Sequence, residues 1–216
     1  MNIKLPEQIN RADWLRYLQV KGEPDERLTK QMDEAERKLL ETATPRGIYR
    51  VLDIGDITTD GVSIKKHLEG CDRAAAFAVT LGSAIDALIN RSQITNMAMA
   101  VLLDTGASVL VDQAADAAEQ SIRDEIADRE ETIYFTSRFS PGYGDYPITH
   151  QRDMLAYLDA ARKIGLTLTS ADMLVPTKSI TAVVGLADHP VTGRLATCGE
   201  CILRDKCDLW RRGEHC

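Results

Sequence analysis

The stretch SRFSPGYGDYP, residues 137–147, combines side chains that could recognise a charged ligand with residues that shape a turn. Arg138 offers a fork of N–H donors that fits a carboxylate through two hydrogen bonds, and Tyr143 adds a phenol hydroxyl. Pro141 presets a turn, and Gly142 lets the backbone approach a ligand closely. The stretch predicts a preshaped loop, and ligand binding is one role that its side chains allow. The alternative is a structural turn whose tyrosine packs on a sheet and whose arginine makes a surface ion pair.

Four of the five cysteines lie close to the C-terminal end, in the spacing C-x2-C-x5-C-x8-C: Cys198, Cys201, Cys207 and Cys216. In a reducing compartment, clustered cysteines are more often ligands or free thiols than disulfides. Cys198 and Cys201 form the tight pair that zinc knuckles and iron–sulfur sites share. The complete spacing matches neither the usual ferredoxin run nor a two-knuckle zinc ribbon, so the type of metal stays open. The fifth, Cys71, is expected to be a buried small residue.

Composition and charge exclude several classes of protein. The formal net charge of −7 argues against a nucleic-acid binder, which normally carries a basic face. No apolar run approaches the ~20 residues needed to span a bilayer, and the first residues lack the layout of a signal peptide. The sequence also lacks a glycine-rich phosphate loop, GxSxG and HExxH. We therefore expect a cytoplasmic protein with no self-contained nucleophile–base pair.

The segments that must position the loop and the cysteines begin with two predicted helices. Residues 10–20 place apolar side chains on one stripe behind a candidate N-cap, Asn10, and residues 24–43 repeat this pattern behind Asp25. Shorter segments follow: a strand at 46–54, a helix at 63–70 and a strand at 73–82. From Ser83 to Arg129 nearly every residue favours helix.

After the loop, residues 149–165 predict a helix that ends at Gly165, and residues 166–176 and 178–187 predict strands with a turn around Pro176. Because helices come first and strands cluster late, the pattern predicts an α+β fold rather than regular βαβ units. We expect an antiparallel twisted sheet flanked by helices, with long central helices. One domain would cover residues 1–190, followed by an irregular Cys-rich metal-binding tail over residues 191–216.

The loop and the segments after it resemble a known family. Arg138, Pro141, Gly142 and Tyr143 match an R-x-x-P-G-Y loop. Further matches are Leu166 to Thr169, Met173, Pro176 and Ser179. In these motifs the chain resembles the C-terminal activation domain of cobalamin-dependent methionine synthase, over about residues 130–187. The layout of the whole chain also resembles stand-alone forms of this domain that end in a Cys-rich tail.

The resemblance implies a domain that binds S-adenosylmethionine and docks over the corrin of a partner protein. There, cobalamin in the Co(II) state takes up one electron and is methylated by S-adenosylmethionine. The implied ligand contacts are Arg138, Ser140, Pro141, Gly142, Tyr143 and Ser179. Tyr143 would lie between ligand and corrin as a catalytic residue. An acid from the preceding long helix would accompany it, with Asp112 as the first candidate and Asp116 and Glu119 as alternatives.

The same resemblance bears on the tail and on the partners. Because reactivation needs a low-potential electron and zinc has no redox function, an iron–sulfur cluster is favoured over zinc at the four cysteines. The implied partners are a cobalamin-binding methionine synthase or another corrinoid protein, and an electron donor.

Two departures from the family pattern keep other functions open. No N-terminal acid matches the one that the family brings to the ligand's amine, and MLVPTKSITA lacks an aromatic residue and a glycine. The chain could instead be a non-catalytic metal-binding module that docks on a corrinoid protein, or an activator of a different corrinoid methyltransferase. Because these alternatives remain, the sequence also leaves open whether the chain acts as a methyltransferase component.

Overall fold

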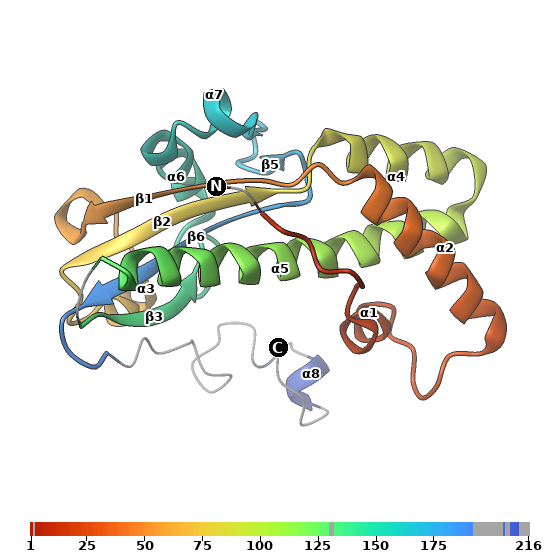
Figure 1. Ribbon diagram of the computed structural model, residues 1–216, viewed down its shortest axis with the longest axis horizontal. Helices are drawn as coiled ribbons and strands as arrows, with labels where there is room; N and C mark the ends of the chain where they lie inside the picture. The colour runs from red at the N-terminus through yellow and green to blue at the C-terminus, as the bar shows by residue number, and fades with distance from the viewer. Residues whose placement is uncertain (2, 130–131, 192–204, 206–207, 212–216) are drawn as a thin grey trace. The chain divides into compact units, whose positions relative to one another are not determined.

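The computed structural model describes residues 1, 3–129, 132–191, 205 and 208–211 (Figure 1). Its helices are α1 (Arg11–Tyr17), α2 (Glu26–Thr42), α3 (Val62–His67), α4 (Ser83–Thr95), α5 (Met97–Ala127), α6 (Gln151–Leu158), α7 (Ala160–Ile164) and α8 (Asp208–Arg211), with short 3-10 turns η1 (Ile54–Asp56) and η2 (Ile148–His150). Its strands are β1 (Arg46–Asp53), β2 (Arg73–Thr80), β3 (Tyr134–Phe139), β4 (Thr167–Leu168), β5 (Leu174–Val175) and β6 (Ser179–Ala187).

Four strands form one sheet in the order β1-β2-β6-β3, and β4 pairs with β5 in a separate hairpin. Backbone hydrogen bonds join opposite ends of neighbouring strands, as antiparallel pairing requires: Thr44 to Leu81 and Ile54 to Asp72 for β1 and β2, and Leu81 to Lys178 and Asp72 to Leu186 for β2 and β6. β3 pairs antiparallel with β6, with a bulge between Phe135 and Arg138. The predicted α+β fold with an antiparallel sheet is confirmed.

The chain divides into two compact units, each built from separate segments. The first contains residues 1–48, 78–121 and 159–180, and the second contains residues 49–77, 122–158 and Thr181 onward. Both fall largely within the span that the sequence assigns to one domain. The boundary at residue 190 stays a prediction, since most residues after 191 lie outside the described part of the chain.

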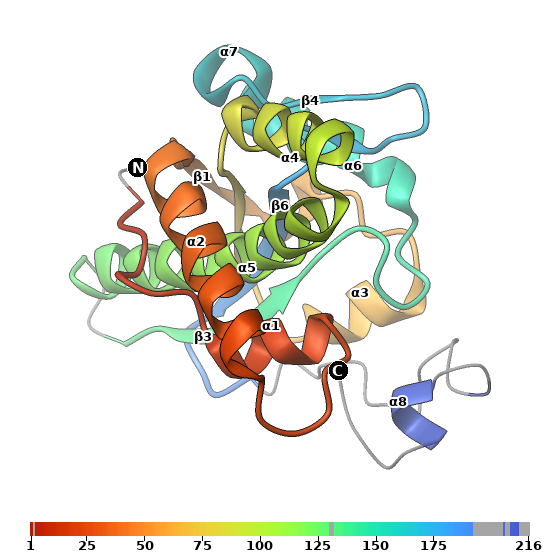
Figure 2. The same ribbon diagram turned by 90° about the vertical axis from the view of Figure 1, so that its right-hand side faces the viewer.

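The first unit is organised around the buried indole of Trp14. Gly106 on α5 allows this close approach, because a Cβ there would lie 2.5 Å from Trp14 Cζ2 and 2.9 Å from Leu39 Cδ1. Trp14 Nε1 also donates to Thr105 Oγ1 over 3.0 Å. α1 and α2 therefore pack beside α5 (Figure 2). Asn10 caps α1 and Asp25 caps α2, as the sequence predicts.

The second unit packs α3 against β3. The ring of His67, which is fully buried, reaches the backbone oxygen of Ser137 with Nε2 over 2.8 Å. Cys71 lies under β6, where a Cβ on Gly185 would be 2.6 Å from its Sγ. Burial raises the pKa of the Cys71 thiol above its usual value. The prediction of a buried, structural Cys71 is confirmed.

Two long predicted helices are interrupted in the structure. The stretch from Ser83 to Arg129 breaks at Asn96, whose backbone is extended and whose Oδ1 accepts from the N–H of Met99 over 3.1 Å. The amide thus begins α5 instead of continuing α4. The stretch 149–165 breaks at Asp159, which adopts a left-handed conformation with φ 52°. Both breaks use short polar side chains that tolerate or favour a non-helical backbone.

One helix, α5, bears on the expectation that no segment is apolar enough to span a membrane. Within the described residues, α5 alone is long and apolar enough, by length and composition, to cross a membrane. The sequence analysis found no such run because polar residues such as Asp104 and Thr105 interrupt it. Within the fold, 56% of the most apolar 18-residue stretch of α5 is buried, as in the core helix of a soluble protein.

Candidate functional site

Arg138 lies at the end of β3 rather than in the loop, directly after the bulge in that strand. It pairs with Val184 on β6 and is half-buried. A bulge re-aims the side chains that follow it, because it inserts an unpaired residue into the ladder. The sheet therefore fixes the backbone of Arg138 just before the loop, and Pro141 within the loop is buried.

A tight turn shapes the loop over residues 140–146. The N–H of Tyr143 donates to the oxygen of Ser140 over 3.1 Å, and the N–H of Gly142 donates to the oxygen of Tyr146 over 2.8 Å. Gly142 and Gly144 have φ values of 95° and 55°, which glycine adopts at no steric cost. The predicted preshaped loop is therefore present, with its backbone bonded to itself.

Asp145 connects this loop to the start of α3, a link that the sequence analysis missed. Its two carboxylate oxygens accept from the backbone N–H groups of Val62 and Ser63 over 2.7 and 2.8 Å. These hydrogen bonds lower the pKa of Asp145 to about 2. No local pattern signals the contact, since the partners are more than eighty residues apart in sequence.

The two tyrosines of the loop have opposite environments. Tyr146 is 1% exposed, donates to the backbone oxygen of Thr58 over 3.0 Å, and stacks on His150 with ring centroids 5.2 Å apart. Burial raises the pKa of its phenol strongly. Tyr143 is 60% exposed, and its ring lies nearly perpendicular to that of Phe139, with ring centroids 6.0 Å apart. The structural role thus falls to Tyr146, which leaves Tyr143 presented to solvent.

His150 forms a second polar contact beneath the loop. Its Nδ1 lies 2.7 Å from Asp153 Oδ2 and its Nε2 lies 3.3 Å from Asp60 Oδ2. The ring links η2 to the residues before α3. Both nitrogens are engaged with carboxylates and one face of the ring is stacked on Tyr146, so the arrangement positions the loop.

Two exposed apolar side chains adjoin the loop that carries Tyr143. Val62 and Ile148 are both exposed, although large apolar side chains are usually buried. Ile148 adjoins the loop, because a Cβ on Gly142 would lie 3.2 Å from its Cδ1. Val62 adjoins it through the bond of its N–H to Asp145. We call Val62, Tyr143 and Ile148 the loop apolar cluster.

The candidate acid belongs to the first unit. Asp112 on α5 is half-buried, and its Oδ2 accepts from the hydroxyl of Tyr17 over 3.3 Å. Of the alternatives further along α5, Asp116 is exposed and Glu119 is half-buried.

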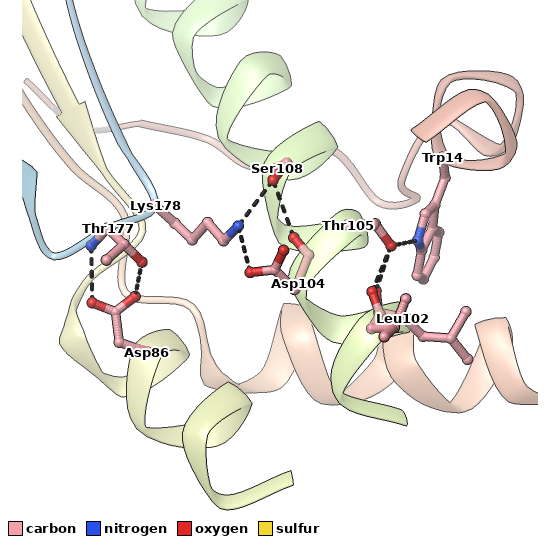
Figure 3. Close-up of polar contacts among 9 residues, drawn as sticks. Trp14, Asp86, Leu102, Asp104, Thr105, Ser108, Thr177 and Lys178 are labelled. Carbon is pink, nitrogen blue, oxygen red and sulfur yellow. Dashed lines mark hydrogen bonds and ion pairs between the residues drawn. The ribbon is translucent and has the colours of Figure 1, made fainter. Parts of the chain in front are cut away.

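The segment 176–179, also in the first unit, is held by polar contacts (Figure 3). Ser179 Oγ lies 2.7 Å from the oxygen of Pro176 and 2.8 Å from Thr80 Oγ1. Its hydroxyl is therefore engaged within the protein. Lys178 Nζ, on a side chain that is 12% exposed, lies 2.8 Å from Asp104 Oδ1 and 2.9 Å from Ser108 Oγ.

Asp86 provides the matching anchor on α4. It accepts from the backbone N–H and the hydroxyl of Thr177, over 2.9 and 2.5 Å. Figure 3 shows Asp86 and Asp104 reaching the two adjacent residues, Thr177 and Lys178. Sequence reasoning missed these anchors. The sequence showed that MLVPTKSITA departs from the family pattern. It did not show that Thr177 and Lys178 in this stretch bind side chains on α4 and α5.

The predicted residues divide between the units. Arg138, Ser140, Pro141, Gly142 and Tyr143 come together in the second, whereas Asp112 and Ser179 belong to the first. The predicted metal ligands Cys198, Cys201, Cys207 and Cys216 lie outside the described residues. In the part of the chain that is described, no group of three or more His, Cys, Asp or Glu side chains could hold a metal ion.

A known protein family matches the part of the chain that contains the loop and the anchored segment 176–179. Residues 58–200 match the family described as vitamin B12 dependent methionine synthase, activation domain. The chain belongs to this activation-domain family. The match contains the whole R-x-x-P-G-Y loop, the anchored segment 176–179 and β6, so the resemblance to the activation domain is confirmed. The resemblance to stand-alone forms with a Cys-rich tail stays a prediction.

A solved activation-type structure shares the fold. The chain is similar to the MetH reactivation domain bound to AdoHcy, with 19% sequence identity and a TM-score of 0.64. The similarity covers 95% of this chain and 82% of that one. No curated protein was found to match the chain.

The two comparisons differ in what they cover. The activation-domain match begins at residue 58 and so omits α1, α2 and β1, whereas the structural similarity extends over nearly the whole chain. The N-terminal helices are thus part of the shared fold although their sequence lies outside the family match. The match ends at residue 200, between Cys198 and Cys201.

Proposed function

We propose that this activation domain binds S-adenosylmethionine and supports the reductive methylation of Co(II) cobalamin held by a partner methionine synthase, in the cytoplasm. Membership of the activation-domain family supports this proposal. The observation that carries it is the difference in exposure between the two tyrosines of the loop. Tyr146 is buried and stabilises the loop, whereas Tyr143 is exposed. A loop needed only as a turn has no use for a second, exposed phenol.

The reaction has two balanced steps. One electron from a donor reduces cobalt from Co(II) to Co(I). The Co(I) electron pair then attacks the methyl carbon of S-adenosylmethionine, so that a Co–C bond forms and the S–C bond breaks. The bonding pair stays on sulfur, which gives S-adenosylhomocysteine. This displacement needs alignment and exclusion of water more than proton transfer.

The residues of the loop suit the ligand's amino-acid end. Arg138 can bind the carboxylate through two N–H groups, because β3 fixes its backbone. Ser140, Pro141 and Gly142 supply a backbone whose shape is set before binding. Ser179 contributes through the segment 176–179 that its hydroxyl holds. Tyr143 and Asp112 are proposed to act at the corrin face.

The loop apolar cluster is proposed as part of the surface that meets the corrinoid partner. Exposed aromatic and aliphatic side chains that lie close together are typical of the core of a protein interface, which is enclosed by a polar rim. Val62, Tyr143 and Ile148 have this character, and they border the proposed ligand residues.

For the tail we propose an iron–sulfur cluster on Cys198, Cys201, Cys207 and Cys216, with zinc as the alternative. Elemental analysis and electron paramagnetic resonance of anaerobically purified protein distinguish the two, since a reduced cluster gives a signal and zinc gives none. Cys201→Ser should lower the metal content, whereas Cys71→Ser should not, because Cys71 is buried under β6.

Titration calorimetry with S-adenosylmethionine tests the proposed function. Wild-type protein should bind saturably, and Arg138→Ala should weaken binding at least about tenfold, the effect of losing a charged hydrogen bond. Arg50→Ala is the matched control, because Arg50 also lies in a strand of the second unit and its side chain donates to the backbone oxygen of Tyr157.

If the folded wild-type chain does not bind, the ligand role falls. A non-catalytic module that docks on a corrinoid protein then becomes the better account. Replacing the partner methionine synthase by another corrinoid methyltransferase in a pull-down tests the remaining alternative.

A further inference from the structure

The N-terminal helix α1 lies outside the family match, yet it is attached to α5 at several points. Trp14 is buried against Gly106 and donates to Thr105. The backbone N–H of Asn10 donates to Gln113 Oε1 over 3.2 Å, and Gln113 Nε2 returns a bond to the oxygen of Gln8 over 3.4 Å. Figure 3 shows the indole of Trp14 facing Thr105.

Tyr17 extends this attachment to the candidate acid. Trp14 and Tyr17 are three residues apart and so project from one face of α1. Their partners Thr105 and Asp112 are seven residues apart, close to two helical turns, and so share one face of α5. Once Trp14 is anchored, the hydroxyl of Tyr17 is brought to Asp112 Oδ2, at 3.3 Å.

We infer that Tyr17 is a positioning residue for Asp112, which gives α1 a role in the proposed reaction. This inference rests on the proposed function, in which Asp112 acts at the corrin face. A half-buried aspartate on a helix still has several rotamers open to it, and a phenol bonded to one oxygen restricts the direction of the other. The restriction is set before the partner binds, so it lowers the cost of alignment.

Tyr17 is suited to this task because it is itself held. The guanidinium of Arg16 lies 5.9 Å from the centre of its ring, and Arg16 pairs with Asp13 on the same helix. The phenol therefore offers a defined donor although its ring is partly exposed. The inference thus gives a function to the N-terminal segment, which lies outside the family match.

The test compares Tyr17→Phe with Thr105→Val in two measurements. The first is S-adenosylmethionine binding by calorimetry. The second is the rate of reductive methylation of a Co(II) methionine synthase, with a one-electron reductant and S-adenosylmethionine. Thr105→Val removes the hydrogen bond from Trp14, but it leaves the indole packed against Gly106 and the Tyr17–Asp112 pair in place.

We expect Tyr17→Phe to lower kcat about three- to tenfold, the effect of losing one hydrogen bond, with the KM for S-adenosylmethionine changed less than about twofold. Thr105→Val should leave kcat within about twofold of wild type. In the Asp112→Asn background, Tyr17→Phe should have no further effect, because the two residues act as one unit.

Three results for the Tyr17 and Thr105 variants would overturn the inference. They are an unchanged kcat in Tyr17→Phe, an equal loss in Thr105→Val, and a full additional loss in the Asp112→Asn background. An unchanged rate in Asp112→Asn itself has the same meaning. Failure of wild-type protein to bind S-adenosylmethionine is a different result, since it removes the proposed function and the inference together.

Discussion

The carboxylate of Asp145 lies 2.8 Å from the backbone nitrogen of Ser63, and through this contact the exposed loop is bonded to the first turn of α3. A second bond, to the N–H of Val62, uses the other oxygen. A carboxylate that accepts two backbone N–H groups favours its ionised form, and this accounts for the low pKa of Asp145.

Asp145→Asn should lower the melting temperature at pH 7, because an amide offers one acceptor oxygen in place of two. The folded-state pKa, about 2, lies below the ordinary value of 3.8, so the contact stabilises the fold above about pH 4. That stability is lost as the pH falls from about 4 towards 2. The difference in melting temperature between wild type and variant should therefore shrink over this range. The exposed Asp56 provides the control, Asp56→Asn, and a difference that stays constant with pH would contradict the assignment.

Gly144→Ala should destabilise the second unit by about 1–3 kcal/mol, the cost of a left-handed non-glycine residue and a close contact. The backbone at Gly144 has φ 55°, and a Cβ there would lie 2.6 Å from Ser63 Oγ. Gly55→Ala is the control, since a Cβ at Gly55 meets no atom within 4 Å and its φ is not positive. Urea unfolding should separate the two variants, and equal midpoints would show that the loop tolerates another shape.

Lys178→Met should lower the free energy of unfolding by roughly 1–2 kcal/mol, because the ammonium is nearly buried and bonded to Asp104 and Ser108. The methionine keeps much of the apolar stem, so the loss reports the charged contacts. Lys30→Met removes an exposed pair with Glu26 and should change stability by less than about 0.5 kcal/mol. Comparable losses in the two variants would mean that the segment 176–179 does not depend on its anchor.

Val62→Asp and Ile148→Asp should weaken binding to a Co(II) methionine synthase at least about tenfold while leaving S-adenosylmethionine affinity unchanged. Both side chains belong to the loop apolar cluster, and neither is a proposed ligand contact. Ile94→Asp introduces the same charge at an exposed apolar position of the first unit and should have little effect. Surface plasmon resonance measures all three. A similar loss in every variant would indicate a general effect of charge.

Local patterns were sufficient to predict much of the fold. Asn10 and Asp25 cap α1 and α2, and the burial of Met32 and Leu39 follows from apolar spacing alone. The breaks at Asn96 and Asp159 were not predictable from spacing, because each depends on one polar side chain that competes with the helix. The bulge before Arg138 likewise depends on pairing with β6, which sequence periodicity does not contain.

The candidate site could be predicted only where its residues are close in sequence. The turn from Ser140 to Tyr146 follows from its prolines and glycines. The roles of Tyr143 and Tyr146 could not be separated, since they depend on whether Thr58 and His150 are near. The contacts of Lys178 with Ser108 and of Tyr17 with Asp112 join residues 70 and 95 positions apart, and only the fold brings them together.

The chain passes between its two units at 48/49, 77/78, 121/122, 158/159 and 180/181, and four of these passages lie inside β1, β2, α5 and β6. Neither unit is a continuous stretch, so a single protease cut or a simple truncation releases neither. A gene fragment that encodes the loop around Tyr143 also lacks the rest of its own unit unless it includes residues from both sides. Insertions and fusions are therefore expected to be tolerated at the exposed turns and not at the unit borders, and a library of random insertions scored for soluble expression would map those borders directly.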